Sequence, residues 1–196
     1  MKKIGIIEYG SGNLKSIQNM LSYLGAEHFI LSKKEDFQKA DKIIFPGQGH
    51  FAQATNALKN SGLIDSIKAE INSGKPFLGI CLGLQILFEK SEEAPLAEGL
   101  SFIKGDVKKF TQGKIPQIGW NKIKTTSNNS ILEDDYYYFV NSYYVCPKEP
   151  EVVSSGCFYY QDFVSSIEKN NLIAVQFHPE KSGEAGIRVF EKWLAK

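Results

Sequence analysis

Arginine, cysteine and histidine are all scarce in this chain of 196 residues, which has one arginine, three cysteines and three histidines. The single arginine, Arg188, leaves no cluster for the bidentate recognition of phosphate. The formal net charge of +1 argues against a nucleic-acid-binding protein, which normally has a basic surface. Three cysteines, an odd count, do not indicate a disulfide framework, so we expect a reducing, cytoplasmic setting.

Long apolar runs are also missing. The longest ones, such as residues 77–81, are far shorter than the roughly 20 residues of a membrane-spanning helix. The amino terminus begins Met-Lys-Lys, as a signal peptide can, but its apolar run stops at Glu8 and no small-residue cleavage pattern follows. We therefore expect residues 4–7 to form the first strand of the fold.

Strand and helix patterns alternate over the first 90 residues. The predicted buried strands are residues 4–7, 29–31, 42–45 and 76–81. The predicted helices are residues 13–24, 51–60, 63–73 and 82–89. This alternation favours a parallel sheet with helices on both faces.

Aromatic and β-branched residues dominate the following part of the chain and predict antiparallel strands in the 100–170 region. These strands are expected at 118–123, 136–145, 152–160 and 163–167, with turns at Gly113, Asn128-Asn129 and Gly156. A last buried strand is predicted at 172–177, and a closing helix at 184–194 with Ile187, Phe190 and Leu194 on one face. The expected fold is one α/β domain spanning residues 1–196, with an open mixed sheet that is mostly parallel.

The pentapeptide Gly79-Ile80-Cys81-Leu82-Gly83 lies between a predicted buried strand and a helical segment. It has the spacing of a nucleophile elbow, in which two glycines allow a strained turn to present the central side chain. The amides that begin the next helix would favour a Cys81 thiolate, and the Leu82 N–H would supply one oxyanion donor. Taken alone, the segment fits a small buried cysteine at a strand end equally well. Cys146 and Cys157 lack this setting and are expected to be structural.

Three histidines could serve as the base for such a nucleophile: His28, His50 and His178. His178 directly follows a predicted buried strand, where catalytic side chains emerge from an open α/β sheet. Pro179 fixes the backbone, so that Glu180 can project to the same side and orient the imidazole. A solvated His-Pro-Glu turn is the more ordinary interpretation of this segment alone, and the elbow makes it the less favoured one.

A loop rich in glycine, Pro46-Gly47-Gln48-Gly49-His50, follows the third predicted strand. Gly47 and Gly49 would let a backbone amide approach a ligand closely. We expect the second oxyanion donor here, from Gly49 or a neighbouring amide, although an ordinary strand-to-helix turn has the same pattern. The other glycine-rich loop, residues 10–12, would need glycine in place of Lys15 to complete a dinucleotide-binding motif, which disfavours that function.

These three segments, in this order, resemble the motifs of class I glutamine amidotransferases, the triad family. Residues 79–85, Gly-Ile-Cys-Leu-Gly-Leu-Gln, resemble the nucleophile motif of the family, and residues 177–180, Phe-His-Pro-Glu, resemble its histidine motif. The resemblance implies that Cys81, His178 and Glu180 hydrolyse glutamine to glutamate and ammonia.

The same resemblance assigns the substrate contacts to two further segments. It implies that Gln85 and the backbone around Ser142 and Tyr143 bind the amino-acid end of glutamine. The chemistry is ordinary acyl transfer, and the sequence has no Cys or His cluster at metal-ligand spacing, so no cofactor or metal is expected.

Four shorter segments are similar to one branch of that family, the glutaminase subunits of imidazole glycerol phosphate synthases. They are residues 9–14, 46–51, 119–121 and 178–183. The resemblance implies a heterodimer with a (β/α)8 cyclase subunit, which receives the ammonia in histidine biosynthesis. It also implies that the partner contacts a set of polar and aromatic residues: the loop from Tyr9 to Asn13, Trp120, Asn121 and Lys181.

Two positions depart from the pattern of this branch, because Gln117 and Asn141 stand where histidine is usual. Neither belongs to the triad, so hydrolysis is not affected. A subunit that supplies ammonia to another synthase, for example one that builds an amidino sugar, would share the triad and differ here. A cysteine hydrolase or peptidase on a related fold would also use the elbow, but it would have no need of Gln85 together with the His-Pro-Glu segment.

Overall fold

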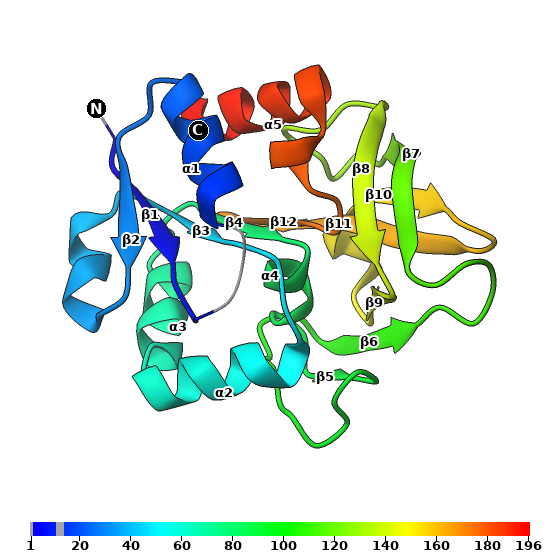
Figure 1. Cartoon of the computed structure of the whole chain (residues 1–196), viewed down its shortest axis with the longest axis horizontal. Coiled ribbons are helices and arrows are strands. Elements are labelled where there is room, and N and C mark those ends of the chain that lie inside the picture. Colours follow the sequence, from blue (N-terminus) through cyan, green and yellow to red (C-terminus); the bar gives the residue numbers. More distant parts are fainter. Residues whose placement is uncertain (1, 11–13) are drawn as a thin grey trace.

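The computed structural model describes residues 2–10 and 14–196. Its described residues form one large mixed sheet, in which a main path of nine strands runs β2-β1-β3-β4-β12-β11-β10-β7-β8 (Figure 1). The parallel half consists of β2 (His28–Leu31), β1 (Ile4–Ile7), β3 (Lys42–Phe45), β4 (Phe77–Ile80) and β12 (Leu172–Val175). The strands of this half are fully or partly buried apolar segments, as the sequence predicts.

The antiparallel half continues from β12 and bends away at the right of Figure 1. It contains β11 (Asp162–Lys169), β10 (Val153–Phe158), β7 (Gln117–Thr125) and β8 (Tyr136–Asn141). A side branch contains β5 (Lys90–Ser91), β6 (Gly105–Lys109) and β9 (Tyr143–Pro147). The predicted antiparallel region is therefore confirmed, whereas the short strands β5 and β6 are not predicted from the sequence.

Helices cover both faces of the parallel half (Figure 1). The helices are α1 (Leu14–Tyr23), α2 (Phe51–Ser61), α3 (Ile64–Asn72), α4 (Leu82–Gln85) and α5 (Gly183–Ala195), with short 3-10 turns η1 (Lys34–Lys39), η2 (Pro150–Val152) and η3 (Pro179–Lys181). One apolar core lies between the sheet and α2 and α3, and a second lies between the sheet and α1 and α5. Among the described residues, no helix combines the length and apolar character needed to cross a bilayer.

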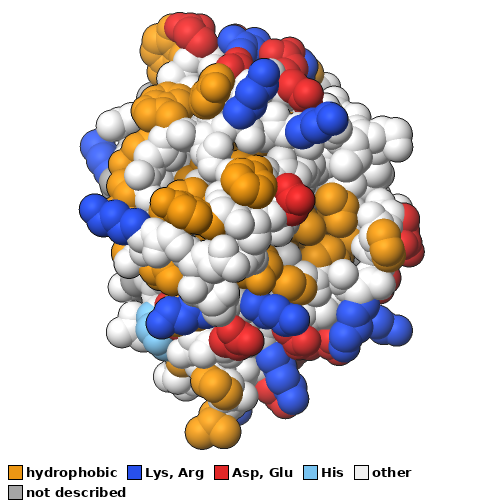
Figure 2. All heavy atoms as spheres, turned by 90° about the vertical axis from the view of Figure 1, so that its right-hand side faces the viewer, with side chains coloured by type: hydrophobic (Ala, Val, Ile, Leu, Met, Phe, Trp, Pro, Cys, Tyr) orange, Lys and Arg blue, Asp and Glu red, His pale blue; other side chains and the backbone are white. Residues whose placement is uncertain are grey.

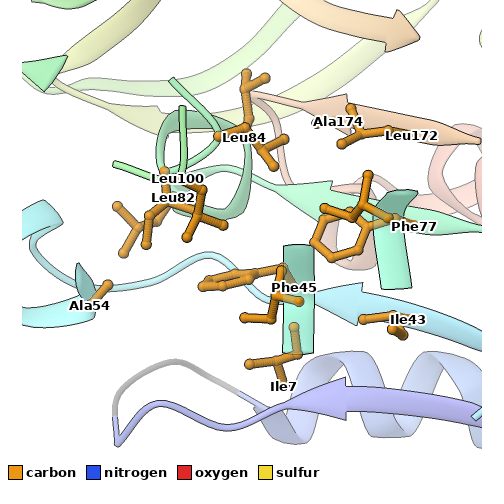
Figure 3. Close-up of a cluster of buried hydrophobic side chains, with 14 of the residues drawn as sticks. Ile7, Ile43, Phe45, Ala54, Phe77, Leu82, Leu84, Leu100, Leu172 and Ala174 are labelled. Carbon is orange, nitrogen blue, oxygen red and sulfur yellow. The ribbon is translucent and has the colours of Figure 1, made fainter. Parts of the chain in front are cut away.

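The first core reaches the carboxyl ends of β3 and β4 (Figure 3). Phe45 and Phe77 come from the two strands, and Leu82 and Leu84 of α4 pack into the same cluster. All four side chains are 2% exposed or less. The turn between β4 and α4 is therefore held on a fixed base, which is what a preorganised site requires.

Three local predictions are wrong. The predicted helix at 82–89 ends at Gln85, because the carbonyls of residues 86–88 accept hydrogen bonds from the chain at residues 100–103. The predicted strand at 136–145 is two strands, because the chain pairs with β7 up to Asn141 and then with β6 from Tyr143. Gly156 is inside β10, where the register with β11 shifts, and makes no turn.

The predicted apolar face of the last helix is rotated. Ile187 and Leu194 are only partly buried in α5, whereas Val189, Phe190 and Trp193 are at most 1% exposed. Phe190 is part of both the predicted and the observed buried face. The buried face of α5 includes Gly186, Val189, Phe190 and Trp193, which recur at helical spacing.

Candidate active site

Cys81 sits at the end of β4, at the turn into α4, as the elbow spacing predicts. Its backbone has φ 52° and ψ −102°, a left-handed value of φ that is strained for a residue with a side chain. The Cys81 amide donates to the Val175 carbonyl of the neighbouring strand at 2.7 Å, and the side chain keeps 8% of its surface exposed. The strained turn therefore presents the sulfur at the carboxyl edge of the parallel sheet.

Close packing explains the glycines around this turn. A Cβ atom on Gly47 would lie 1.7 Å from the Ile80 carbonyl oxygen and 2.7 Å from the Cys81 Cβ. A Cβ on Gly79 would lie 2.7 Å from the Gly83 carbonyl oxygen, and one on Gly83 would lie 2.4 Å from the Phe45 carbonyl oxygen. Any side chain at these three positions would push the nucleophile turn out of place.

His178 follows β12, and the turn η3 that begins at Pro179 brings Glu180 back to it. The His178 Nδ1 and Glu180 Oε1 atoms are 2.8 Å apart, and the two side chains are 3% and 4% exposed. The backbone of His178 is fixed too, because its N–H donates to the Tyr138 carbonyl at 2.9 Å and its carbonyl accepts from the Ser182 hydroxyl at 2.7 Å.

The charge state of His178 depends on its neighbours. Burial opposes the charged imidazolium, but the charge of Cys81, a hydrogen bond with Cys81 and the contact with Glu180 outweigh burial and raise the pKa of His178 to about 10. Burial raises the pKa of Cys157 to about 12 and also raises the pKa of Cys146. The two other cysteines therefore stay as thiols at neutral pH, which agrees with the structural role predicted for them.

A cavity of about 310 Å³ opens directly above the cysteine. Its lining unites residues predicted separately as triad, oxyanion, substrate-binding and partner-facing groups: Gly47, Gly49, Cys81, Leu82, Gln85, Ser142, Tyr143, His178 and Lys181. Of the predicted triad, Glu180 alone stays outside the lining, behind His178.

A larger hollow of about 910 Å³ lies over β7, β10 and β11, and none of the predicted site residues lines it. Figure 2 looks onto the right-hand side of Figure 1, where hydrophobic side chains mix with lysines and acidic residues.

Two backbone segments can supply amides to this cavity. Leu82 is the first residue of α4 and lines the cavity, and a backbone N–H at this position of a helix has no partner within the helix. On the opposite loop, the Gln48 amide donates to the Tyr9 hydroxyl at 3.3 Å, and that hydroxyl donates to the Gln48 carbonyl at 2.7 Å. The hydroxyl also lies 3.2 Å from the Pro46 carbonyl oxygen, so Tyr9 fixes this loop.

Two residues of the site are not assigned to it from the sequence: Gln176, and Tyr9, which is predicted to face the partner but is buried against Phe45. Tyr9 is 5% exposed and stacks on Phe45 with ring centroids 5.1 Å apart. Gln176 is fully buried beside Cys81 and contacts Gln85. A signal for Gln176 was present, because a polar residue that directly continues the buried strand 172–175 needs a buried partner.

The residues predicted to face a partner differ in their setting. Trp120 on the outer face of the β7–β8 hairpin is 56% exposed and contacts Tyr138 edge-on, with ring centroids 5.9 Å apart. Lys181 lines the cavity. The amide of Asn121 is already used, since it donates to the Phe158 carbonyl at 2.8 Å and accepts from the Lys122 amide. Asn13 lies outside the described residues.

Gln117 and Asn141 face each other across β7 and β8 and are 2% and 5% exposed. Their oxygens Oε1 and Oδ1 find no hydrogen-bond partner among the described residues, and the same holds for Glu180 Oε2. No group of three His, Cys, Asp or Glu side chains in the described part of the chain is arranged to hold a metal ion. The arrangement that does exist is a thiol, an imidazole and a carboxylate in series, which is suited to acyl transfer through a cysteine nucleophile.

Comparison with known proteins agrees with this chemistry. The family model described as "Glutamine amidotransferase class-I" matches residues 5–196. "Imidazole glycerol phosphate synthase subunit HisH" of Thermus thermophilus is 41% identical over 182 residues, 93% of this chain and 91% of that protein. "Imidazole glycerol phosphate synthase hisHF, chloroplastic" of Arabidopsis thaliana is 41% identical over 199 residues, 97% of this chain and 34% of the plant protein. A solved structure described as "Crystal structure of glutamine amidotransferase" superposes with a TM-score of 0.80 at 18% identity, covering 98% of this chain and 97% of that one.

Proposed function

The chain belongs to the class I glutamine amidotransferase family, and from that premise we propose that it is the glutaminase subunit of an imidazole glycerol phosphate synthase. It hydrolyses glutamine to glutamate and ammonia, acts as a single domain over residues 1–196 and works in the cytoplasm. The observation that carries the proposal is the buried Cys81–His178–Glu180 series opening into a cavity of about 310 Å³.

The reaction follows from the positions of these groups. The Cys81 sulfur attacks the side-chain amide carbon of glutamine, and His178 donates a proton to the departing ammonia. Water, deprotonated by His178, then attacks the thioester and releases glutamate. Glu180 keeps Nδ1 of His178 engaged at 2.8 Å, so that the other ring nitrogen serves Cys81 and the substrate.

The developing negative charge on the amide oxygen needs donors in a dry setting. The Leu82 N–H supplies one, and the loop of Gly47 and Gly49 supplies the other. In the present conformation the Gln48 amide is bonded to the Tyr9 hydroxyl, so this amide becomes a donor to substrate only after the peptide leaves Tyr9. Gln85, Ser142 and Tyr143 hold the amino-acid end of glutamine.

The partner is a (β/α)8 cyclase subunit in a heterodimer that makes imidazole glycerol phosphate and the aminoimidazole carboxamide ribotide of histidine biosynthesis. The relatives from Thermus thermophilus and Arabidopsis thaliana support this assignment through their names. Trp120 on the outer face of the hairpin and Lys181 at the cavity rim support a docking face on this side of the molecule.

Glutamate release from glutamine, with and without the cyclase, tests the hydrolysis. Cys81→Ala abolishes glutamine-dependent synthesis by the complex, while synthesis from added ammonia continues at the wild-type rate because it needs the cyclase alone. Absence of glutamate release in both settings would contradict the glutaminase assignment. Activity with an amidino-sugar synthase instead of the cyclase would keep the hydrolysis and replace the partner.

A further inference from the structure

We propose that Gln176 is a positioning residue that holds the Cys81 sulfur in its thiolate form through a hydrogen bond. The proposal deepens the glutaminase function and rests on it. The Gln176 Nε2 atom donates to the Cys81 Sγ at 3.4 Å, and the Gln176 side chain is fully buried. A donor aimed at sulfur stabilises the anion more than the thiol, because hydrogen bonds to charged groups are stronger than those between neutral groups.

Sheet register explains why the two side chains meet. Val175 of β12 pairs with Ile80 of β4, so Gln176 and Cys81 are the next residues along two parallel neighbours. The backbone N–H of Gln176 donates to the Ser165 carbonyl at 2.8 Å, and the backbone N–H of Cys81 donates to the Val175 carbonyl at 2.7 Å. Both residues directly follow their strands, and these backbone hydrogen bonds hold them at the edge of the sheet.

A series of hydrogen bonds sets which end of the Gln176 amide meets the sulfur. Tyr143 contributes a backbone carbonyl, which can only accept, and Gln85 Nε2 donates to it at 3.4 Å. The same Nε2 donates to Gln176 Oε1 at 3.1 Å. The remaining end of Gln176, Nε2, is therefore the end that faces Cys81.

The reversed orientation would be unfavourable at both ends. If the side-chain amide of Gln176 were rotated by half a turn, its NH2 group would face the NH2 group of Gln85, and its oxygen would face the thiolate. Two donors would then oppose each other in a buried position, and two acceptors would do the same. The Tyr143 carbonyl therefore sets the orientation of both side-chain amides up to Cys81, and Gln85, which lines the cavity, is linked to the sulfur through Gln176.

Alkylation of Cys81 by iodoacetamide tests this without using glutamine. The rate follows the thiolate fraction, so its dependence on pH gives the apparent pKa of Cys81. Mass spectrometry of the Cys81 peptide separates it from Cys146 and Cys157, whose pKa values burial raises. The variants are Gln176→Leu, which removes the donor, and Gln176→Glu, which places a carboxylate against the sulfur.

We expect the apparent pKa of Cys81 to rise by about one unit in Gln176→Leu, so that alkylation slows about tenfold at any pH below both midpoints. Gln176→Glu raises it further, because the carboxylate repels the thiolate. The control Gln117→Leu removes another buried amide, which is not among the hydrogen-bond partners of the Cys81 sulfur in the described part of the chain, and keeps the wild-type profile. Thermal melting of each variant, followed by circular dichroism, confirms that the protein is still folded at the temperature of the alkylation assay.

An unchanged alkylation profile in folded Gln176→Leu would overturn the proposal, and so would an equal shift in Gln117→Leu. Failure of the proposed function is a separate result. In that case the profile shifts in the Gln176 variants while the wild-type complex releases no glutamate from glutamine.

Discussion

His178 has one of the most strongly altered environments in the molecule. A buried imidazole with no charged neighbour would lose its proton more easily than in water. Here Cys81 and Glu180 reverse that effect and raise the pKa of His178 to about 10. At neutral pH the imidazole is therefore charged, so in the proposed mechanism the proton that the departing ammonia needs is already on His178.

Nuclear magnetic resonance of the imidazole protons measures this directly, because only His28 and His50 contribute further signals. We expect His178 to titrate far above 6.5 in the wild type. Its pKa falls in Cys81→Ala, which removes the partner charge, and falls in Glu180→Gln for the same reason. A titration of His178 near 6.5 in the wild type would contradict the ion pair.

The same shift has a consequence for stability. Because the pKa of His178 in the folded state is above its ordinary value of 6.5, the contribution of His178 to stability is complete below pH 6.5 and is lost as pH rises through about 10. The difference in unfolding free energy between the wild type and His178→Asn should therefore shrink over that interval, as measured by urea titration at a series of pH values.

At the scale of elements, the site depends on how closely β3, β4 and α4 approach one another. The glycine spacing in the sequence predicts the elbow correctly, because close approach at Gly79 and Gly83 is a local requirement of the turn. The contact between Gly47 and the Ile80 carbonyl joins two strands and has no local signal. The length of α4 is mispredicted for a similar reason, since distant residues at 100–103 take the carbonyls that would have continued the helix.

Gly47→Ala tests this packing. The added methyl group overlaps backbone atoms that cannot rotate away, so we expect a loss of about 1–3 kcal/mol in unfolding free energy and loss of glutamine hydrolysis. The matched control is Gly156→Ala, where the nearest atom to the new Cβ is 3.7 Å away. That variant should stay within about 0.5 kcal/mol of the wild type in denaturant titration. Equal stability of both variants would show that β3 can shift freely.

At the scale of the whole molecule, the sequence predicts the layers and the strands of the parallel half, because each buried strand is a separate apolar run. It does not predict that the chain stops pairing with β7 at the end of β8 and then pairs with β6 in β9, because this change of partner depends on residues that are distant in the sequence. Most residues predicted for the site meet in one cavity despite these errors. The family motifs mark strand ends, and the sheet brings strand ends together.

The outer face of the β7–β8 hairpin carries three of the large hydrophobic side chains that the fold leaves exposed: Ile118, Trp120 and Tyr136. If the cyclase docks there, Trp120→Ala should weaken the complex by about 2 kcal/mol, which is roughly thirtyfold in Kd. Calorimetric titration of the two subunits measures the change. Tyr23→Ala, an equally simple truncation of an exposed aromatic residue at the end of α1, should leave the affinity unchanged. A wild-type affinity in Trp120→Ala would place the docking face elsewhere.

The hairpin and His178, the proposed catalytic base, are linked through Tyr138. Its carbonyl accepts from the His178 amide, and its own amide donates to the Ser182 hydroxyl at 3.0 Å, which in turn bonds the His178 carbonyl. Trp120 rests against the ring of the same tyrosine. The outward-facing strand β8 therefore also holds the backbone of His178 in place. Three hydrogen bonds thus join the hairpin to the backbone of His178, so a protein bound on the outer surface of the hairpin would press on the same strand that holds His178 in position.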